Sequence, residues 1–466
     1  MADEAVPAGA RESAPFRLNA RMIAYAIAAA ALLLVAWTFY RAFAHQDEAW
    51  APVATSVIGK PPPPLPTTPD LWHGRIDYRL IDQRLQTLAA QPEMAGLAVA
   101  IVEDGKLSFV KGYGVTDFET NTPIAPGTVF RWASLSKGVA GTMAALLASE
   151  GKLSLNDTVA QWGSTLRLPG GAEQKLTIGQ LLSHQTGLTK NAYDGRLEGG
   201  ANPAALRMGL AAAPQQCAPG TCHSYQNVAF DAASEIEGKA GGKLYGQLVE
   251  EKLFKPLGMK RAGVGMDALI GSENWAKPHR GHQERPVVES YFRVPAAAGV
   301  SSSILDLERW MEAQMGLWPK VLKPAVVHEA HRVWVPTHRV YAGRLARALD
   351  DPGYGLGWRS FTYQGHLLQG HSGAVDGYRS TMVYDPKEKT GIVMLWNSNW
   401  GRPFAFPLEL FDNYYRIDPT DWLDLPPGST ILPAGAAPAQ TNPQDMAAED
   451  VQSGDVAEAP AQRKKR

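Results

Sequence analysis

The segment from Ser134 to Ala148 constrains this 466-residue chain more than any other. It opens with Ser134-Leu135-Ser136-Lys137 and continues with small and apolar residues, which predicts a buried helix that Gly151 can end. Positions i and i+3 share a helix face, so Nζ of Lys137 can reach Oγ of Ser134 and take its proton. Backbone N–H groups at the helix start stabilise developing negative charge. The segment therefore predicts covalent catalysis by Ser134.

A second S-x-x-K match, Ser108 to Lys111, serves as an internal control. It follows the turn sequence Asp104-Gly105 and alternates in polarity, which predicts a strand within a hairpin from Gly96 to Thr116. Successive side chains of a strand point to opposite faces, so Ser108 and Lys111 cannot meet. We therefore predict that Ser108 has no catalytic role.

Two further motifs lie downstream. The first is Tyr225-Gln226-Asn227, and the second is His371-Ser372-Gly373, inside a glycine-rich stretch where the backbone can approach a substrate closely. A Lys-Thr-Gly sequence, Lys389-Thr390-Gly391, is an alternative candidate for this last motif. It follows the charged turn sequence Asp385 to Glu388, however, and precedes an apolar strand. We therefore place Lys389 at a solvated hairpin tip and assign the third motif to His371.

The order and wide spacing of the three motifs resemble the penicillin-recognising serine hydrolases, specifically the branch of class C β-lactamases and D,D-peptidases. The resemblance covers roughly Asp77 to Arg416. It implies an α and β protein with the β-lactamase/transpeptidase-like fold, in which an antiparallel five-stranded sheet is flanked by helices beside a mostly helical subdomain. Strand-like alternation at Gly96–Thr116 and at Tyr354–Asn397 agrees with a sheet assembled from both ends of the chain.

The resemblance also implies roles for individual residues. Ser134 attacks a carbonyl, and Lys137 and Tyr225 share the role of base. A lysine with an ordinary pKa of about 10.4 is a poor base at neutral pH, so either its pKa is lowered or Tyr225 acts as a phenolate; the sequence leaves both routes open. Asn227 bonds Lys137 and the substrate amide, while the backbone N–H groups of Ser134 and Ala374 form the oxyanion hole. Substrate is also bound by the third motif, His371, Ser372 and Gly373.

A histidine in place of the third-motif lysine favours peptidase or esterase chemistry over β-lactamase activity. We expect His371 to titrate near neutrality, so that its attraction for a substrate carboxylate weakens as the pH rises. The preferred function is hydrolysis of D-amino-acid or cell-wall peptides through an acyl-enzyme, with no metal or cofactor. The alternatives are a β-lactamase, an esterase and, from another class, an inactive envelope protein that binds peptidoglycan.

The apolar, charge-free segment Met22 to Tyr40 is long enough to cross most of a bilayer as a helix, and arginines precede it. The positive-inside tendency then leaves the short N-terminal tail in the cytoplasm and exports the rest to the periplasm or cell exterior. The alternative is a signal peptide cleaved after Ala44. The balance of 45 Lys+Arg against 46 Asp+Glu gives no reason to expect a nucleic-acid partner.

The only two cysteines, Cys217 and Cys222, favour a local disulfide in an exported chain, the alternative being two free thiols. A bridge here would stiffen the approach to Tyr225. The predicted organisation is a tail at 1–21, an anchor at 22–40, a proline-rich linker at 41–76, the hydrolase domain at 77–425 and a disordered tail at 426–466.

Overall fold

The computed structural model of the chain describes residues 74–338 and 340–425. The predicted cytoplasmic tail, anchor and C-terminal tail, and nearly all of the predicted linker, lie outside these residues. Within the described ranges, none of the helices combines the length and the apolar character that crossing a bilayer requires.

The large sheet has eight strands in the order β2-β1-β13-β12-β11-β10-β9-β8. Their bounds are β1 (Gly96–Glu103), β2 (Lys106–Gly114), β8 (Val335–Pro336), β9 (Leu349–Tyr354), β10 (Arg359–Tyr363), β11 (His366–Val375), β12 (Tyr378–Asp385) and β13 (Thr390–Trp396). All neighbouring strands are antiparallel, and β1 pairs with β13, so the two ends of the chain do build one sheet.

The expected five-stranded sheet is wrong in its strand count. The five strands from β2 to β11 are present, but β10, β9 and β8 extend the sheet beyond β11. A tight turn at Gln364 and Gly365, both with positive φ, joins β10 to β11 as a hairpin. Because β10 pairs only with His366 to Gly370, the other half of β11 keeps one free edge.

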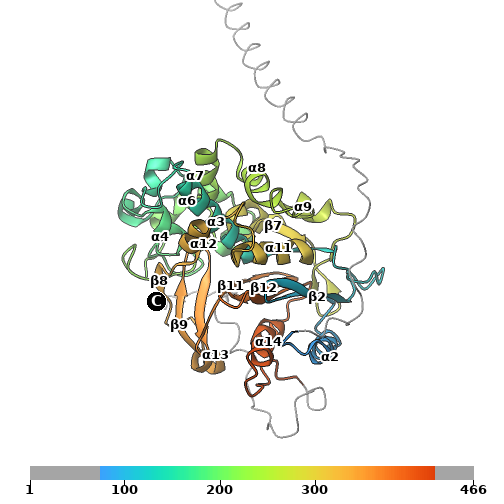
Figure 1. Cartoon of the computed structure of the whole chain (residues 1–466). Coiled ribbons are helices and arrows are strands. Elements are labelled where there is room, and N and C mark those ends of the chain that lie inside the picture. The colour runs from blue at the N-terminus through green and yellow to red at the C-terminus, as the bar shows by residue number, and fades with distance from the viewer. Residues whose placement is uncertain (1–73, 339, 426–466) are drawn as a thin grey trace, which may run out of the picture. The chain divides into compact units, whose positions relative to one another are not determined.

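Each face of the sheet packs against a different set of helices (Figure 1). The helices α2 (Tyr78–Ala89) and α14 (Phe406–Tyr415) cover one face, where they bury Leu97, Val99 and Ile101 of β1. The alternate β1 residues Ala98, Ala100 and Val102 belong to the core on the opposite face. This period of two explains why β1 is apolar from Leu97 to Val102, since both of its faces are buried.

The helical region lies between β2 and β10 in sequence. Its α-helices are α3 (Ser136–Ser149), α4 (Ile178–Leu182), α5 (Asp194–Glu198), α6 (Pro203–Gly209), α7 (Ala232–Gly241), α8 (Tyr245–Val249), α9 (Asp267–Ile270), α10 (Pro295–Ala298), α11 (Ile304–Gln314), α12 (Pro324–His331) and α13 (Gly343–Ala348). Its 3₁₀ helices are η1 (Ala133–Leu135), η2 (Val159–Trp162), η3 (Pro169–Gln174), η4 (Leu210–Ala212) and η6 (Ser290–Arg293), and η5 (Glu250–Phe254) is a π-helix; a further 3₁₀ helix, η7 (Arg402–Ala405), follows β13. Small sheets are formed by β3 (Val129–Arg131), β7 (Val300–Ser303) and β4 (Gly263–Val264), and by β5 (His279–Arg280) and β6 (Gln283–Glu284).

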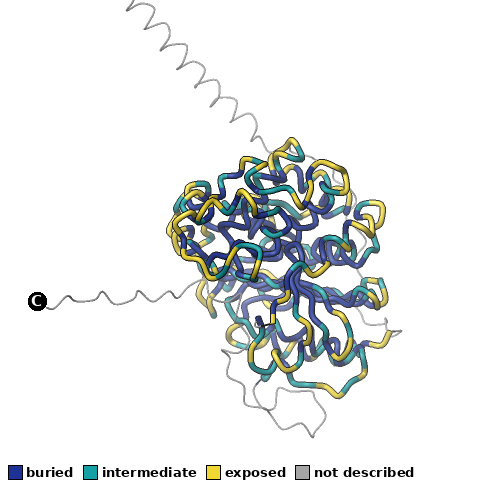
Figure 2. Tube along the Cα trace, turned by 90° about the vertical axis from the view of Figure 1, so that its left-hand side faces the viewer, coloured by how far each residue is buried: buried dark blue, intermediate teal, exposed yellow. Residues whose placement is uncertain are grey.

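Helix α3 is the predicted buried helix, and its central position accounts for its small residues. A Cβ atom added at Gly141 would lie 1.6 Å from the carbonyl oxygen of Leu356, so only glycine allows this approach. The helix ends at Ser149, and Gly151 follows with a φ of +69°. Figure 2 shows the buried residues concentrated inside the domain and the exposed residues gathered in its outer loops.

Candidate active site

Ser134 lies on η1, in the short connection between β3 and α3. The preceding residue, Ala133, has a φ of +49°, a left-handed conformation that is rare for a residue with a Cβ atom. Such backbone strain concentrates at functional sites, where it holds one side chain in a defined direction. Ser134 is 8% exposed. A substrate can therefore reach this residue only through its small exposed part.

Lys137 is fully buried, and its Nζ atom makes three hydrogen bonds. It lies 3.2 Å from Oγ of Ser134, 2.6 Å from Oδ1 of Asn227 and 3.1 Å from the carbonyl oxygen of Ala297. Three acceptors match the three N–H groups of an ammonium ion. After loss of one proton, the amine lone pair can face Ser134 while the other two bonds persist. Sequence and structure therefore agree on the contact that a lysine base requires.

Tyr225 lies beside the same lysine. The Nζ atom of Lys137 is 4.6 Å from the ring centroid of Tyr225 and 5.5 Å from that of Phe230. Both rings present π electrons to the lysine, and such contacts favour its cationic form. Lys137 and Tyr225 are thus neighbours, and the two routes predicted above both remain open.

Asn227 connects Lys137 to an acid that the motif analysis missed. Its Oδ1 accepts from Lys137, and its Nδ2 donates to Oδ2 of Asp194 at 2.7 Å. Burial raises the pKa of Asp194 to about 7, although the bond from Asn227 and the charge of Lys137 both act to lower it. Asp194 is 33 residues from Asn227 in sequence and precedes a glycine, a dipeptide that indicates only a turn.

His371 is buried and does not behave as expected from the sequence. Burial, reinforced by the positive charges of Arg359 and Lys137, holds its pKa well below the ordinary 6.5. The expectation that His371 titrates near neutrality and attracts a substrate carboxylate is therefore wrong. The physical reason is desolvation, which penalises the charged imidazole and which a local sequence motif does not report.

A hydrogen-bond chain fixes the proton positions on His371. The backbone N–H of Gln226 donates to Nδ1 of His184, so the Nε2 atom of neutral His184 carries a proton toward the Tyr354 hydroxyl, 3.1 Å away. Tyr354 can then donate to Nε2 of His371 at 2.9 Å, which leaves Nδ1 of His371 to donate to the carbonyl of Ser372. The chain joins the second motif to the third, and Tyr354 is a link that sequence reasoning missed.

The free half of β11 faces η1, which carries Ser134. A Cβ atom added at Gly373 would lie 2.9 Å from the backbone N of Ser134, so a glycine is needed for this close approach. The predicted oxyanion donors, the N–H groups of Ser134 and Ala374, come from these two facing segments. The hydroxyl of Ser372 lies 3.1 Å from that of Thr381 on β12, so its side chain is already engaged within the sheet.

Both sequence decoys lie away from this site. Ser108 and Lys111 lie on β2, where Ser108 donates to the carbonyl of Lys106 and Lys111 pairs with Asp82 at 2.7 Å. Lys389 lies at the tip of the β12–β13 hairpin, as predicted. It is half-buried rather than fully solvated, because its ammonium group donates to the carbonyl of Met315.

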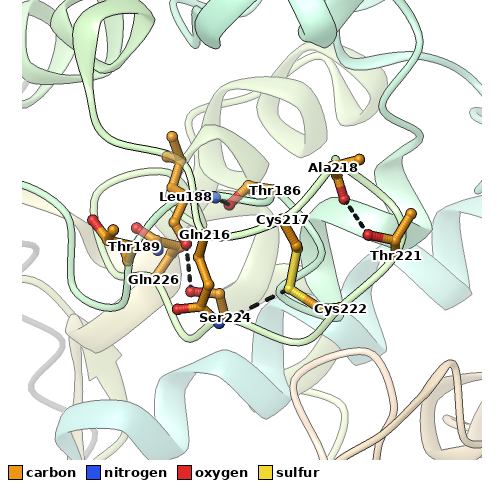
Figure 3. Close-up of a disulfide and its surroundings, with 10 residues drawn as sticks. All are labelled: Thr186, Leu188, Thr189, Gln216, Cys217, Ala218, Thr221, Cys222, Ser224 and Gln226. Carbon is orange, nitrogen blue, oxygen red and sulfur yellow. Dashed lines mark hydrogen bonds between the residues drawn. A yellow bond between two sulfur atoms is a disulfide. The ribbon is translucent and has the colours of Figure 1, made fainter.

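Cys217 and Cys222 form the predicted disulfide (Figure 3). Backbone hydrogen bonds from Gly220 to Gln185 and from Ser224 to His184 tie this loop to the segment that holds His184. The imidazole of His184 in turn bonds the backbone N–H of Gln226 and the hydroxyl of Tyr354. A loop this short gains roughly 2 kcal/mol from a bridge. The disulfide therefore stiffens the segment that leads to Tyr225.

Residues 81–409 match the family model described as Beta-lactamase. The chain belongs to this family, whose members are serine hydrolases. Across residues 74–338 and 340–425, no group of three or more His, Cys, Asp or Glu side chains is arranged to hold a metal ion.

The chain is also similar to named relatives. It is 27% identical over 333 residues to the unguisins hydrolase ungD' of Aspergillus campestris, a match that covers 66% of this chain and 60% of that protein. It is 26% identical over 329 residues to protein flp of Staphylococcus aureus strain MW2, covering 68% of this chain and 63% of that protein. The match thus spans about three fifths of the length of these relatives.

Two solved structures share the fold. The octameric penicillin-binding protein homologue from Pyrococcus abyssi superposes with a TM-score of 0.64 and 22% identity, covering 73% of this chain and 77% of that one. A mutant class C β-lactamase superposes with a TM-score of 0.57 and 22% identity, covering 69% and 92%. The β-lactamase/transpeptidase-like fold expected from the motifs is confirmed.

Proposed function

We propose that this chain hydrolyses amide or ester bonds through an acyl-enzyme on Ser134. The observation that carries the proposal is the position of Lys137, whose Nζ lies 3.2 Å from Oγ of Ser134 while Asn227 and the carbonyl of Ala297 hold it from two other sides. A buried lysine held in this way is oriented toward the serine before a substrate binds. Preorganisation of this kind lowers the barrier to proton transfer.

The reaction follows from these contacts. Oγ of Ser134 attacks the carbonyl carbon, and its proton passes to the base, Lys137 or Tyr225. The oxyanion accepts hydrogen bonds from the N–H groups of Ser134 and Ala374. Collapse of the tetrahedral intermediate expels the amine or alcohol, which takes the proton from the base. A water molecule then attacks the acyl carbon while the same base takes its proton. The base returns this proton to Oγ as the bond between Oγ and the acyl carbon breaks, which releases the acid and Ser134.

We further propose a peptide with a D-amino acid, such as a cell-wall peptide, as the substrate. The choice of this substrate class rests on the resemblance of the three motifs to the D,D-peptidases, and a relative named as a hydrolase of unguisins supports hydrolysis in general. With His371 neutral, Arg359 is a further cation next to the second motif besides Lys137, and its Cζ lies 5.9 Å from the ring centroid of Tyr225 and 5.3 Å from that of Tyr354. A carboxylate at the end of a peptide would be attracted to it.

The proposed location is the cell membrane, with Met22 to Tyr40 as a single-pass anchor and the hydrolase domain on the periplasmic or outer side. The disulfide supports an oxidising compartment. Fractionation tests the anchor: we expect the protein to stay with membranes after a high-salt wash and to keep its N-terminus near Met1. A soluble form that begins at His45 would establish cleavage instead.

Intact-mass spectrometry of the purified protein tests the reaction. We expect incubation with a D-Ala-D-Ala peptide, a penicillin or a p-nitrophenyl ester to give an adduct on Ser134, or turnover that Ser134→Ala abolishes. The preferred substrate then separates peptidase from β-lactamase and esterase. Tight binding of peptidoglycan fragments with neither adduct nor turnover would favour the inactive binding protein.

A further inference from the structure

Asp194 is a buried acid that lies directly behind the proposed catalytic machinery. It begins α5, and its side chain reaches the Asn227 amide from the side opposite Lys137. One carboxylate oxygen, Oδ2, accepts from Nδ2 of Asn227 at 2.7 Å. The other oxygen, Oδ1, is buried and has no hydrogen-bond partner among the described residues. A buried polar atom without a partner costs stability, so its retention calls for a reason in function.

The chemistry of the amide supplies that reason. The Asn227 side chain has an acceptor end and a donor end of nearly equal size, and shape alone does not decide which end faces Lys137. An ammonium group needs the oxygen end. If the amide turned over, its NH₂ group would face the lysine, and the bond of 2.6 Å from Nζ to Oδ1 would be replaced by a repulsive contact between donors. Oδ2 of Asp194 accepts a hydrogen bond from the NH₂ end of the Asn227 amide, and this favours the observed orientation.

We propose that Asp194 is a positioning residue for the reaction, which fixes the Asn227 amide so that its oxygen holds Lys137 toward Ser134. The inference rests on the proposed function, because it matters only if Lys137 serves Ser134 as a base. Asp194 touches neither the substrate nor the reacting atoms. Asn227 is the residue that contacts both Asp194 and Lys137.

The other groups around Asp194 indicate a suitable control. The Tyr291 hydroxyl lies 3.4 Å from Oδ2 of Asp194 but only 2.8 Å from Oε1 of Glu198, so the shorter bond holds Tyr291 to Glu198. The charges that bear on Asp194 are those of Lys137 and Glu198. Tyr291→Phe removes the weak contact to Asp194 and leaves the bond between Asp194 and Asn227 intact. It is therefore a matched control for a change near Asp194 that spares the orientation of Asn227.

The experiment measures the rate constant for labelling of Ser134 by a fluorophosphonate, together with kcat/KM on the best substrate. Asp194→Leu has nearly the same size but no acceptor, and we expect it to slow labelling at least about tenfold. Asp194→Asn still offers an acceptor oxygen to Asn227, so we expect a rate within about threefold of wild type. Tyr291→Phe should also stay within about threefold. Asp194→Ala replaces Asp194→Leu if the latter does not fold, as judged by circular dichroism.

A double mutant separates positioning from a general structural role. Asn227→Ala already removes the group through which Asp194 acts, so adding Asp194→Leu should slow labelling no further. Multiplied effects in the double mutant would overturn the inference, as would equal losses in Asp194→Leu and Asp194→Asn or no loss in either. If wild type itself shows no labelling of Ser134, the proposed function fails and the inference falls with it. Normal labelling of both wild type and Asp194→Leu overturns the inference alone.

Discussion

Two of the S-x-x-K matches in this chain, Ser108–Lys111 and Ser134–Lys137, differ in everything that matters for chemistry. Ser108 and Lys111 lie on strand β2, where Lys111 turns to Asp82. Ser134 and Lys137 lie where η1 meets α3, and their side chains are 3.2 Å apart. A separation of three residues brings side chains together on a helix and parts them on a strand. The backbone conformation, and not the motif, therefore decides whether a serine and a lysine can react together.

The two lysines also have different surroundings. Lys137 is fully buried, whereas the side chain of Lys111 is 43% exposed. Water screens the pair formed by Lys111 and Asp82, so that pair contributes about 0.2–1 kcal/mol at most. No such screening acts on Lys137, whose hydrogen bonds must be satisfied by the protein. Burial gives one lysine a defined geometry and leaves the other as a solvated charge.

The largest expected effect compares the two serines. Ser134→Ala should abolish covalent labelling by a fluorophosphonate or a penicillin, because it removes the attacking oxygen, and Ser108→Ala should label like wild type. Intact-mass spectrometry of both variants makes the measurement. Equal labelling of Ser134→Ala and wild type would overturn the assignment of the nucleophile. Ser136 is a poorer control than Ser108, since its hydroxyl bonds the backbone of Ala133 and Val300 and holds the fold.

The next effect compares the two lysines. Lys137→Ala should lose nearly as much labelling rate as Ser134→Ala, because residues that act as one catalytic unit are not additive. Lys111→Ala should keep the wild-type rate and change only the stability, by less than about 1 kcal/mol. Stopped-flow labelling and chemical denaturation measure the two quantities. A rate loss in Lys111→Ala that matches the loss in Lys137→Ala would break the comparison.

The third effect compares His371, assigned to the third motif, with Lys389 of the competing Lys-Thr-Gly sequence. His371→Ala should lower kcat/KM at least about tenfold, or 1.4 kcal/mol, because it breaks the chain through Tyr354 to the loop of Tyr225. Lys389→Ala should stay within about threefold, since Lys389 lies on a hairpin tip and bonds Met315. The pKa of His371 is held well below 6.5, so the wild-type rate should show no ionisation of this residue from pH 6.5 upward. The reverse ranking of the two variants would show that the third motif has been misplaced.

The smallest expected effect compares two acids: Asp194, which contacts Lys137 through Asn227, and Asp82, which pairs with Lys111. Burial raises the pKa of Asp194 from an ordinary 3.8 to about 7, so the folded protein favours the protonated acid and loses stability as the pH rises between these values. Asp194→Asn removes this loss, and its unfolding free energy should exceed that of wild type above pH 7 by a margin that shrinks on acidification. Asp82→Asn should instead cost up to about 1 kcal/mol at neutral pH. Denaturation at several pH values measures both, and a pH-independent difference for Asp194→Asn would contradict the assignment.

Several features follow from the sequence by itself, because short-range patterns determine them. Alternation after Asp104-Gly105 predicts the β1–β2 hairpin, and small apolar residues after Lys137 predict α3. The turn sequence before Lys389 correctly places the decoy K-T-G at a hairpin tip. In each case the residues that decide the structure lie within one turn or a few strand positions of one another, so no long-range contact is needed.

Other features were decided only by the tertiary structure. The sheet has eight strands because β10, β9 and β8 extend it beyond β11. This strand pairing depends on chain segments that come together only in the folded protein. The neutral state of His371 and the contact of Asp194 with Asn227 depend on burial and on neighbours far away in sequence. Desolvation and long-range hydrogen bonds are properties of the packed interior, whereas a motif records only which residues are adjacent along the chain.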